Sequence, residues 1–309
     1  MKIKLQHAIG LALATAVISG VATFVAKKAV TVVSDPVVFT LLKNAIVAML
    51  LIGLAVVFTK FKELKGLRKK DWTKLIAIGV VGGSIPFILF FTGLTMTTAV
   101  SAGMIHKTLF IWVALLAVPF LKERVGWKQA AAFILLIGGS FALGGFKGFQ
   151  FGIGELMVLV ATLFWAVENI IAKKALANLS SLLVAGARMV FGSVILLAVV
   201  GFQGNLSLIG GLNAEQWIWT LIPALFLIGY VTTWYTALKH APASLVASLL
   251  VPAALITNVL SLVFLDKALT VAEIGGSIFF IAAITLLVWG AKKTSLQQRY
   301  AEATSNNTT

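Results

Sequence analysis

Long apolar runs, separated by short polar segments, dominate the chain. A helix that crosses a bilayer needs about 20 consecutive apolar residues, and the runs can be divided into ten stretches of about that length. Strands of a membrane barrel would instead alternate over short segments. We therefore expect an all-α integral membrane fold with ten transmembrane helices. The predicted spans are residues 8–26, 36–58, 74–94, 99–121, 127–146, 152–172, 181–202, 217–238, 243–265 and 271–291.

Composition agrees with this pattern and excludes a water-soluble protein. Of the 309 residues, 60% are apolar and 11% are charged, whereas a typical soluble domain carries about 25% charge. The polar segments are too short to hold a soluble catalytic domain. The chain has no cysteine and three histidines, so thiol chemistry and Cys-ligated metals are excluded, a structural zinc site is remote, and we expect no cofactor.

The net charge of +15 would suggest a nucleic-acid partner in a soluble protein. In a membrane protein it indicates topology, because loops rich in Lys and Arg stay in the cytoplasm. With the N-terminus inside, only Lys27, Lys28, Lys147 and Lys267 fall on the opposite side. We therefore predict cytoplasmic termini in a bacterial-type plasma (inner) membrane and no nucleic-acid partner. The basic run at 60–74 could also bind anionic lipid, but the topological interpretation is preferred.

The two halves of the chain resemble each other at an offset near 145. The sequence Ala-Lys-Lys-Ala at 26–29 recurs at 172–175, and Lys43 falls opposite Arg188. Since each half has five spans, an odd number, the second half must insert upside down, as in many secondary transporters. A binding site is then expected at the repeat interface near mid-membrane. The predicted parts are residues 1–146 and 147–291, the two repeats, and 292–309, a polar cytoplasmic tail.

The chain resembles the EamA-type transporters of the drug/metabolite transporter superfamily. The resemblance covers nearly the whole chain and rests on the two five-helix halves, the basic segment after the second span, and Phe-Leu-Lys-Glu-Arg at 120–124. In that family the fourth and ninth spans usually contain a proline and end in a Leu-Gly-Glu-like turn. Here Pro252 and Glu123 keep these features, whereas Thr108 and Lys267 replace them. The resemblance implies a metabolite carrier whose central cavity is lined by spans 1, 3, 4, 6, 8 and 9.

Four charged residues fall inside the predicted spans: Lys43, Lys107, Glu168 and Arg188. Each costs about 2.5–3.5 kcal/mol at the centre of a bilayer. One acid cannot neutralise three bases, so an anionic group on the ligand is the natural complement. Lys107, about 12 Å deep by helix rise, is the leading candidate for this anion site. The alternative is that Lys107 snorkels or bonds a backbone carbonyl freed by a nearby proline, Pro86 or Pro119.

The other embedded polar residues leave alternatives open. His106 is a proton carrier or a packing histidine. Glu168 is functional, or it snorkels or pairs with Lys173 near the inner end of its span. Lys43 and Arg188 occupy equivalent places in the two halves, which favours a scaffold role in binding backbone or lipid phosphate, with gating as the second choice.

Helical spacing completes the expected cavity wall. Thr15, Ser19 and Thr23 share one face of span 1, at i, i+4 and i+8. The repeat offset maps them near Ala161, Trp165 and Asn169 of span 6. Pro86 and Phe90 of span 3 likewise match Tyr230 and Trp234 of span 8. The full candidate binding set is Lys107, His106, Glu168, Asn169, Trp165, Ser19, Thr15, Thr23, Phe90, Tyr230 and Trp234.

These residues favour a secondary transporter of a small anionic or zwitterionic metabolite, an amino acid or a related carboxylate, working by alternating access. The first alternative is a phosphorylated-metabolite exchanger. The second is an integral membrane enzyme acting on a lipid-linked substrate, which is disfavoured because no acid cluster, His-x-x-Glu-like pair or Ser/His/Asp set is present. Glycines in spans 5 and 10 permit close helix packing, and dimerisation through these spans stays open.

Overall fold

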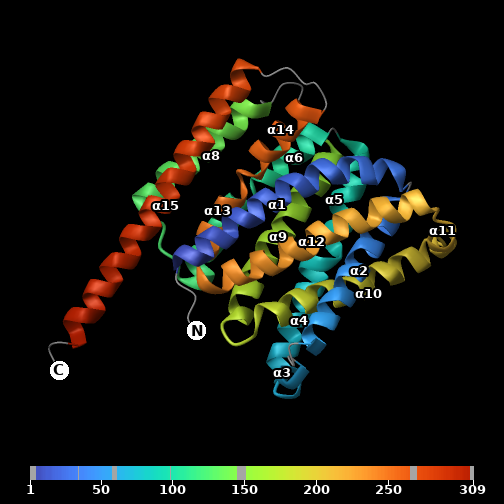
Figure 1. Ribbon diagram of the computed structural model, residues 1–309, viewed down its shortest axis with the longest axis horizontal. Helices are drawn as coiled ribbons and strands as arrows, with labels where there is room; N and C mark the ends of the chain where they lie inside the picture. Colours follow the sequence, from blue (N-terminus) through green and yellow to red (C-terminus); the bar gives the residue numbers. More distant parts are fainter. Residues whose placement is uncertain are drawn as a thin grey trace.

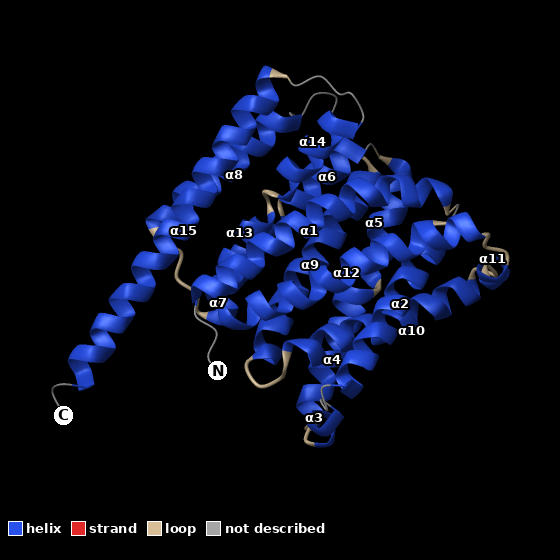
Figure 2. Ribbon diagram, viewed as in Figure 1, coloured by secondary structure: helices blue, strands red, loops and turns tan. Residues whose placement is uncertain are grey.

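The structure is a computed structural model that describes residues 5–33, 35–57, 61–97, 99–144, 151–264 and 270–306. Every regular element in these ranges is a helix (Figure 2). The helices are α1 (Leu5–Val32), α2 (Pro36–Val57), α3 (Phe61–Lys65), α4 (Lys69–Gly83), α5 (Ile85–Met96), α6 (Ala99–Lys107), α7 (Leu109–Leu121), α8 (Trp127–Gly144), α9 (Ile153–Leu176), α10 (Ser181–Phe202), α11 (Leu206–Gly210), α12 (Ala214–His240), α13 (Ala243–Leu250), α14 (Ala253–Phe264) and α15 (Val271–Asn306).

The all-helical character predicted from hydropathy is confirmed for the described residues. In the described ranges, seven stretches are long and apolar enough to cross a membrane: Leu5–Val25, Pro36–Val57, Lys69–Gly93, Ile153–Leu176, Ser181–Phe202, Ala214–His240 and Ile274–Ala291. Three shorter apolar stretches are Ile105–Leu121, Trp127–Ala142 and Ala243–Thr257. The ten-span inverted repeat stays a prediction. Lys147 and Lys267, which support the predicted orientation, lie outside the described residues.

Three of the predicted spans are not continuous helices. The third is divided between α4 and α5 at Ser84, the fourth between α6 and α7 at Thr108, and the ninth between α13 and α14 at Val251 and Pro252. At the fourth, the Thr108 hydroxyl donates to the Ile105 carbonyl at 2.6 Å, a local bond that competes with the helical pattern. Hydropathy alone does not register such interruptions, because the apolar run continues across them.

Helices from the two halves of the chain interleave. α1 packs against α12 and α14, α4 against α9 and α10, and α5 against α9. α7 packs against both α9 and α13, and α8 lies along α15 (Figure 1). The largest apolar core accordingly contains residues from Ala8 to Leu287. Beyond the bundle, α15 continues as a helix through residues 292–306 of the predicted polar tail (Figure 1).

Glycines allow two of these helix pairs to approach closely, as expected for small residues in membranes. A Cβ on Gly83 of α4 would lie 3.0 Å from the Cα of Gly192 in α10. A Cβ on Gly139 of α8 would lie 3.0 Å from the Gly276 carbonyl oxygen in α15. The small-residue faces of α8 and α15 thus pack against each other within one chain.

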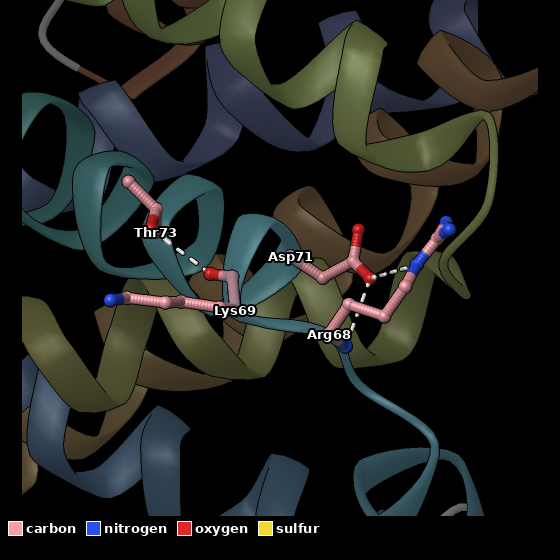
Figure 3. A network of polar contacts seen from close by, with 4 residues as sticks. All are labelled: Arg68, Lys69, Asp71 and Thr73. Atoms are coloured by element: carbon pink, nitrogen blue, oxygen red, sulfur yellow. Dashed lines mark hydrogen bonds and ion pairs between the residues drawn. The ribbon is translucent and has the colours of Figure 1, made fainter.

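The basic segment between α2 and α4 is tied to the bundle. At the start of α4, the Asp71 carboxylate accepts the backbone N–H of Arg68 at 3.2 Å and lies 3.6 Å from the Arg68 Nε (Figure 3). Thr73 donates to the Lys69 carbonyl in the same turn (Figure 3). In α3, Glu63 accepts the N–H of Ser180 at 2.7 Å, which fixes the segment against the start of α10.

Candidate functional site

The break between α4 and α5 creates the acceptor around which the site is built. In an unbroken helix the Gly82 carbonyl would accept the N–H of residue 86, but Pro86 has none. The Gly82 carbonyl instead accepts the indole N–H of Trp165 at 3.1 Å and the Nη2 of Arg188 at 3.1 Å. One freed carbonyl therefore joins α4, α9 and α10.

A chain of hydrogen bonds continues from Arg188 to an acid. The Arg188 Nη1 donates to the Tyr235 hydroxyl at 3.4 Å, and that hydroxyl donates to the Glu168 carboxylate at 2.5 Å. The three side chains are buried, with exposed fractions of 7%, 0% and 1% for Arg188, Tyr235 and Glu168. Gly82 lies against them, since a Cβ there would overlap the Cγ of Glu168. Such a charged group inside a membrane bundle needs paired or bonded partners.

Lys43 brings a second cation to the same place. Its Nζ lies 5.4 Å from the ring centroid of Phe87, and the Cζ of Arg188 lies 6.0 Å from the same ring. Lys43 and Arg188, which the sequence repeat pairs, thus both lie next to one aromatic side chain of α5. We call Lys43, Glu168, Arg188, Tyr235 and the Gly82 carbonyl the central polar cluster.

Aromatic side chains from three helices adjoin the central polar cluster. Trp165 of α9 contacts Phe87 and Phe90 of α5, with ring centroids 5.4 and 5.6 Å away, and His106 of α6 at 4.9 Å. His106 also contacts Phe90 at 5.6 Å. The structure therefore brings together three residues of the predicted site: Trp165, His106 and Phe90.

Two further predicted residues, Tyr230 and Trp234, stack on each other in α12 with ring centroids 5.9 Å apart. Trp234 is buried, and Tyr235, which bonds Glu168, follows it directly. Asn169 is also buried, and its amide donates to the Trp165 carbonyl at 2.9 Å. These three predicted residues lie on the helices that carry the central polar cluster.

Lys107, the leading sequence-based candidate, is placed differently. It is half-buried in the last turn of α6, where a cation is favourable beside the negative end of the helix dipole. Within the described ranges it forms no bond to Glu168 or Arg188. The alternative that it bonds the carbonyl freed by Pro86 is wrong, because Trp165 and Arg188 occupy that carbonyl.

The alternatives for Glu168 are also resolved. Glu168 is buried rather than snorkelling, and it does not pair with Lys173. The Nζ of Lys173 instead donates to the carbonyls of Leu238 at 2.6 Å and Ala241 at 2.7 Å. Lys173 thus closes the end of α12, and Glu168 belongs to the centre of the bundle.

The three residues of the predicted polar face of α1 differ in burial. Thr15 is buried and donates to the Thr233 hydroxyl of α12 at 2.7 Å. Ser19 is half-buried, and Thr23 is exposed and bonds the Ser19 carbonyl at 2.8 Å. Burial therefore decreases along this face, from Thr15 to Thr23.

Sequence reasoning missed Tyr235 and the Gly82 carbonyl. The signal for Gly82 was present, since a proline four residues later always removes the helical donor of a carbonyl. Tyr235 gave no signal apart from being one of three tyrosines. Arg188 was interpreted as a scaffold that binds backbone or lipid phosphate, and it does bind backbone, at the Gly82 carbonyl.

Two further features of the described residues bear on a metal site and on a ligand cavity. Within the described ranges, no three His, Cys, Asp or Glu side chains gather closely enough to hold a metal ion. A cavity of about 170 Å³ lies beside α11 and is lined in part by Asp35 and Gln216. These two side chains are already bonded, because Asp35 accepts from Asn205 at 2.8 Å and Gln216 donates to the Val32 carbonyl.

Comparisons with known proteins agree with this architecture. A family model described as the EamA-like transporter family matches the chain twice, at residues 6–145 and 152–289. A protein named an uncharacterized transporter from Methanothermobacter thermautotrophicus is 24% identical over 238 residues, covering 73% of this chain and 67% of that protein. Another from Clostridium kluyveri is 23% identical over 280 residues, covering 88% and 89%.

A solved crystal structure shares the fold. It superposes with a TM-score of 0.76 at 15% sequence identity, covering 94% of this chain and 99% of the other. The relatives point to a transporter rather than an enzyme. The family match spans nearly all of the described helices and confirms the resemblance noted in the sequence. The chain is therefore an integral membrane protein that belongs to the EamA-like transporter family.

Proposed function

We propose that the protein is a secondary transporter that moves a small carboxylated metabolite, an amino acid or a related carboxylate, by alternating access around the central polar cluster. The family supports transport of a small molecule across the membrane. Buried ionisable residues in membrane helices are by default candidates for the substrate pathway. The site proposed here therefore centres on Arg188, Glu168 and Lys43.

The observation that carries this proposal is the convergence of Lys43 and Arg188 on Phe87. In the described residues one acid, Glu168, accompanies these two cations, so a carboxylate on the substrate completes the charge balance. Trp165, Phe90 and the stacked pair of α12 supply apolar and aromatic surface for the rest of the molecule.

Together with this function we propose an architecture of ten membrane spans arranged as two inverted halves. Two matches of the same family model support a duplication. The helix breaks at Thr108 and Pro252, which occupy matching places in the two halves, support it further, because secondary transporters use broken helices at their sites. The Lys and Arg distribution supports cytoplasmic termini in a plasma (inner) membrane.

The test is counterflow in proteoliposomes preloaded with amino acids, other carboxylates or sugar phosphates. We expect flux of a carboxylate class that is strongly reduced in Lys43→Ala and kept in Lys107→Ala, both variants being monodisperse in detergent. The opposite result would return the anion site to Lys107. Flux of sugar phosphates alone would favour the phosphorylated-metabolite exchanger, and no flux in any class would contradict a carboxylate carrier.

A further inference from the structure

The direction of hydrogen bonds in the central polar cluster defines its charge. Arg188 donates to the Tyr235 oxygen, which leaves the Tyr235 hydroxyl hydrogen to be donated to Glu168. Glu168 thus accepts a hydrogen bond in the same chain that holds the Arg188 guanidinium, an arrangement that suits an ionised carboxylate. With Lys43 and Arg188 positive and Glu168 negative, the cluster carries one net positive charge.

The members of the cluster differ in how well a ligand can reach them. Glu168 and Tyr235 are 1% and 0% exposed, so an ammonium group on a ligand has no route to the carboxylate. Lys43 is half-buried and is held by the rings of Phe39 and Phe87, at 5.3 and 5.4 Å, rather than by an acid. The Nε of Arg188 is buried and has no hydrogen-bond partner among the described residues.

We infer that Glu168 determines the charge that a substrate must bring, so that the site selects a carboxylate with a single net negative charge over a zwitterion or a dianion. This inference rests on the proposed function. The physical reason is that an uncompensated charge is costly away from water. A monoanion neutralises the cluster, a zwitterion leaves one positive charge, and a dianion leaves one negative charge. Glu168 acts by reducing two positive charges to one, and it need not touch the substrate.

Three probes with the same isobutyl side chain test the inference: leucine, 4-methyl-2-oxopentanoate and isobutylmalonate. At neutral pH they carry net charges of zero, minus one and minus two. Counterflow of each is measured with the full chain in proteoliposomes. The wild-type protein is expected to move the oxo acid fastest.

Charge-changing variants give the decisive comparison. Glu168→Gln raises the cluster to two positive charges and should shift the rate ratio toward isobutylmalonate by about tenfold or more. Lys43→Gln lowers it to zero and should shift the ratio toward leucine. The double variant Lys43→Gln/Glu168→Gln has one positive charge again and should regain the preference for the oxo acid, which a merely structural role of Glu168 would not produce.

Matched controls change charge elsewhere. Lys107→Gln, in α6, and Glu155→Gln, at the start of α9, should leave the preference unchanged.

If Glu168→Gln does not fold, Lys43→Gln still tests the charge balance, and Glu168→Asp should keep the wild-type preference. Wild-type preference for leucine or isobutylmalonate, or unchanged ratios in folded Glu168→Gln or Lys43→Gln, would overturn the inference while leaving a carrier. No counterflow of any probe, with none in the wider carboxylate panel, would contradict both the inference and the proposed function.

Discussion

The carboxylate of Glu123, just after α7, accepts the backbone N–H of Ala243 at the start of α13, with 2.6 Å between the two atoms. The same carboxylate accepts the N–H of Ser244 at 3.1 Å and its hydroxyl at 2.6 Å. The Ser244 hydroxyl in turn accepts from the Gln129 amide at 3.0 Å. Because the N-terminus of a helix carries partial positive charge, an acid is stabilising there. This contact joins the two halves of the chain at one end of the bundle.

Neutralising this acid should loosen the contact between α7 and α13. Glu123→Gln removes the charge and one acceptor, a change of about 1 kcal/mol for a helix cap. Since the chain has no cysteine, a single Ala247→Cys, at a position that is 3% exposed, reports opening through its rate of maleimide labelling. We expect severalfold faster labelling in Glu123→Gln. Glu215→Gln, at an exposed acid of α12, is the control, and equal rates in all backgrounds would contradict the prediction.

Gly82→Ala should damage the centre of the bundle. The added methyl overlaps the Glu168 side chain and would lie 3.3 Å from the Arg188 Nε, and overpacking a core costs about 1–3 kcal/mol. We expect a lower melting temperature in detergent and loss of flux. At Gly186 of α10 a Cβ meets no heavy atom within 4 Å, so Gly186→Ala should be neutral. A stable, active Gly82→Ala would show that the cluster is not packed as described.

Pro86→Ala should separate stability from transport. Alanine restores the N–H that can bond the Gly82 carbonyl, in competition with Trp165 and Arg188. Since one such hydrogen bond contributes about 1 kcal/mol, we expect flux to fall severalfold while the melting temperature stays the same or rises. Pro119→Ala, inside α7, is the matched control. Undiminished flux in Pro86→Ala would mean that the freed carbonyl has no part in transport.

Lys173→Gln should weaken the end of α12. The ammonium group bonds the carbonyls of Leu238 and Ala241, and that of Lys239 more weakly at 3.4 Å. Hydrogen bonds to charged groups contribute about 1.5–3 kcal/mol, so we expect a clear drop in melting temperature. Its exposed neighbour Lys174 provides the comparison through Lys174→Gln, and similar drops in both variants would argue against a capping role.

Hydropathy could predict the helices because a membrane-spanning helix is formed by consecutive apolar residues, which are visible in the sequence. Counting along the run also placed Lys107 well inside its segment, whereas it placed Glu168 near the inner end of its span. Hydropathy could not predict the interruption at Thr108, where a threonine in an apolar run carries no breaking signal. That interruption is what places Lys107 at a helix end.

The candidate site was harder to predict because it depends on how each helix is rotated against its neighbours. Residues at i and i+4 share a face, but the spacing does not say which neighbour that face meets. Thr15 turned toward Thr233 and Trp165 toward the Gly82 carbonyl. Arg188, interpreted as a scaffold from its symmetric position, shows that a residue can bond backbone and still belong to the candidate site.

The interleaving of helices across the two halves has a consequence for assembly. Each half carries a copy of the family domain, yet α1, α4 and α5 have their main partners among α9, α10, α12 and α14. During synthesis these early helices can therefore reach their final packing only after the later helices have been inserted. Lys43 and Gly82 come from the first half, and Glu168, Arg188 and Tyr235 from the second. A chain cut between residues 144 and 151 can form the cluster only when both fragments are made together.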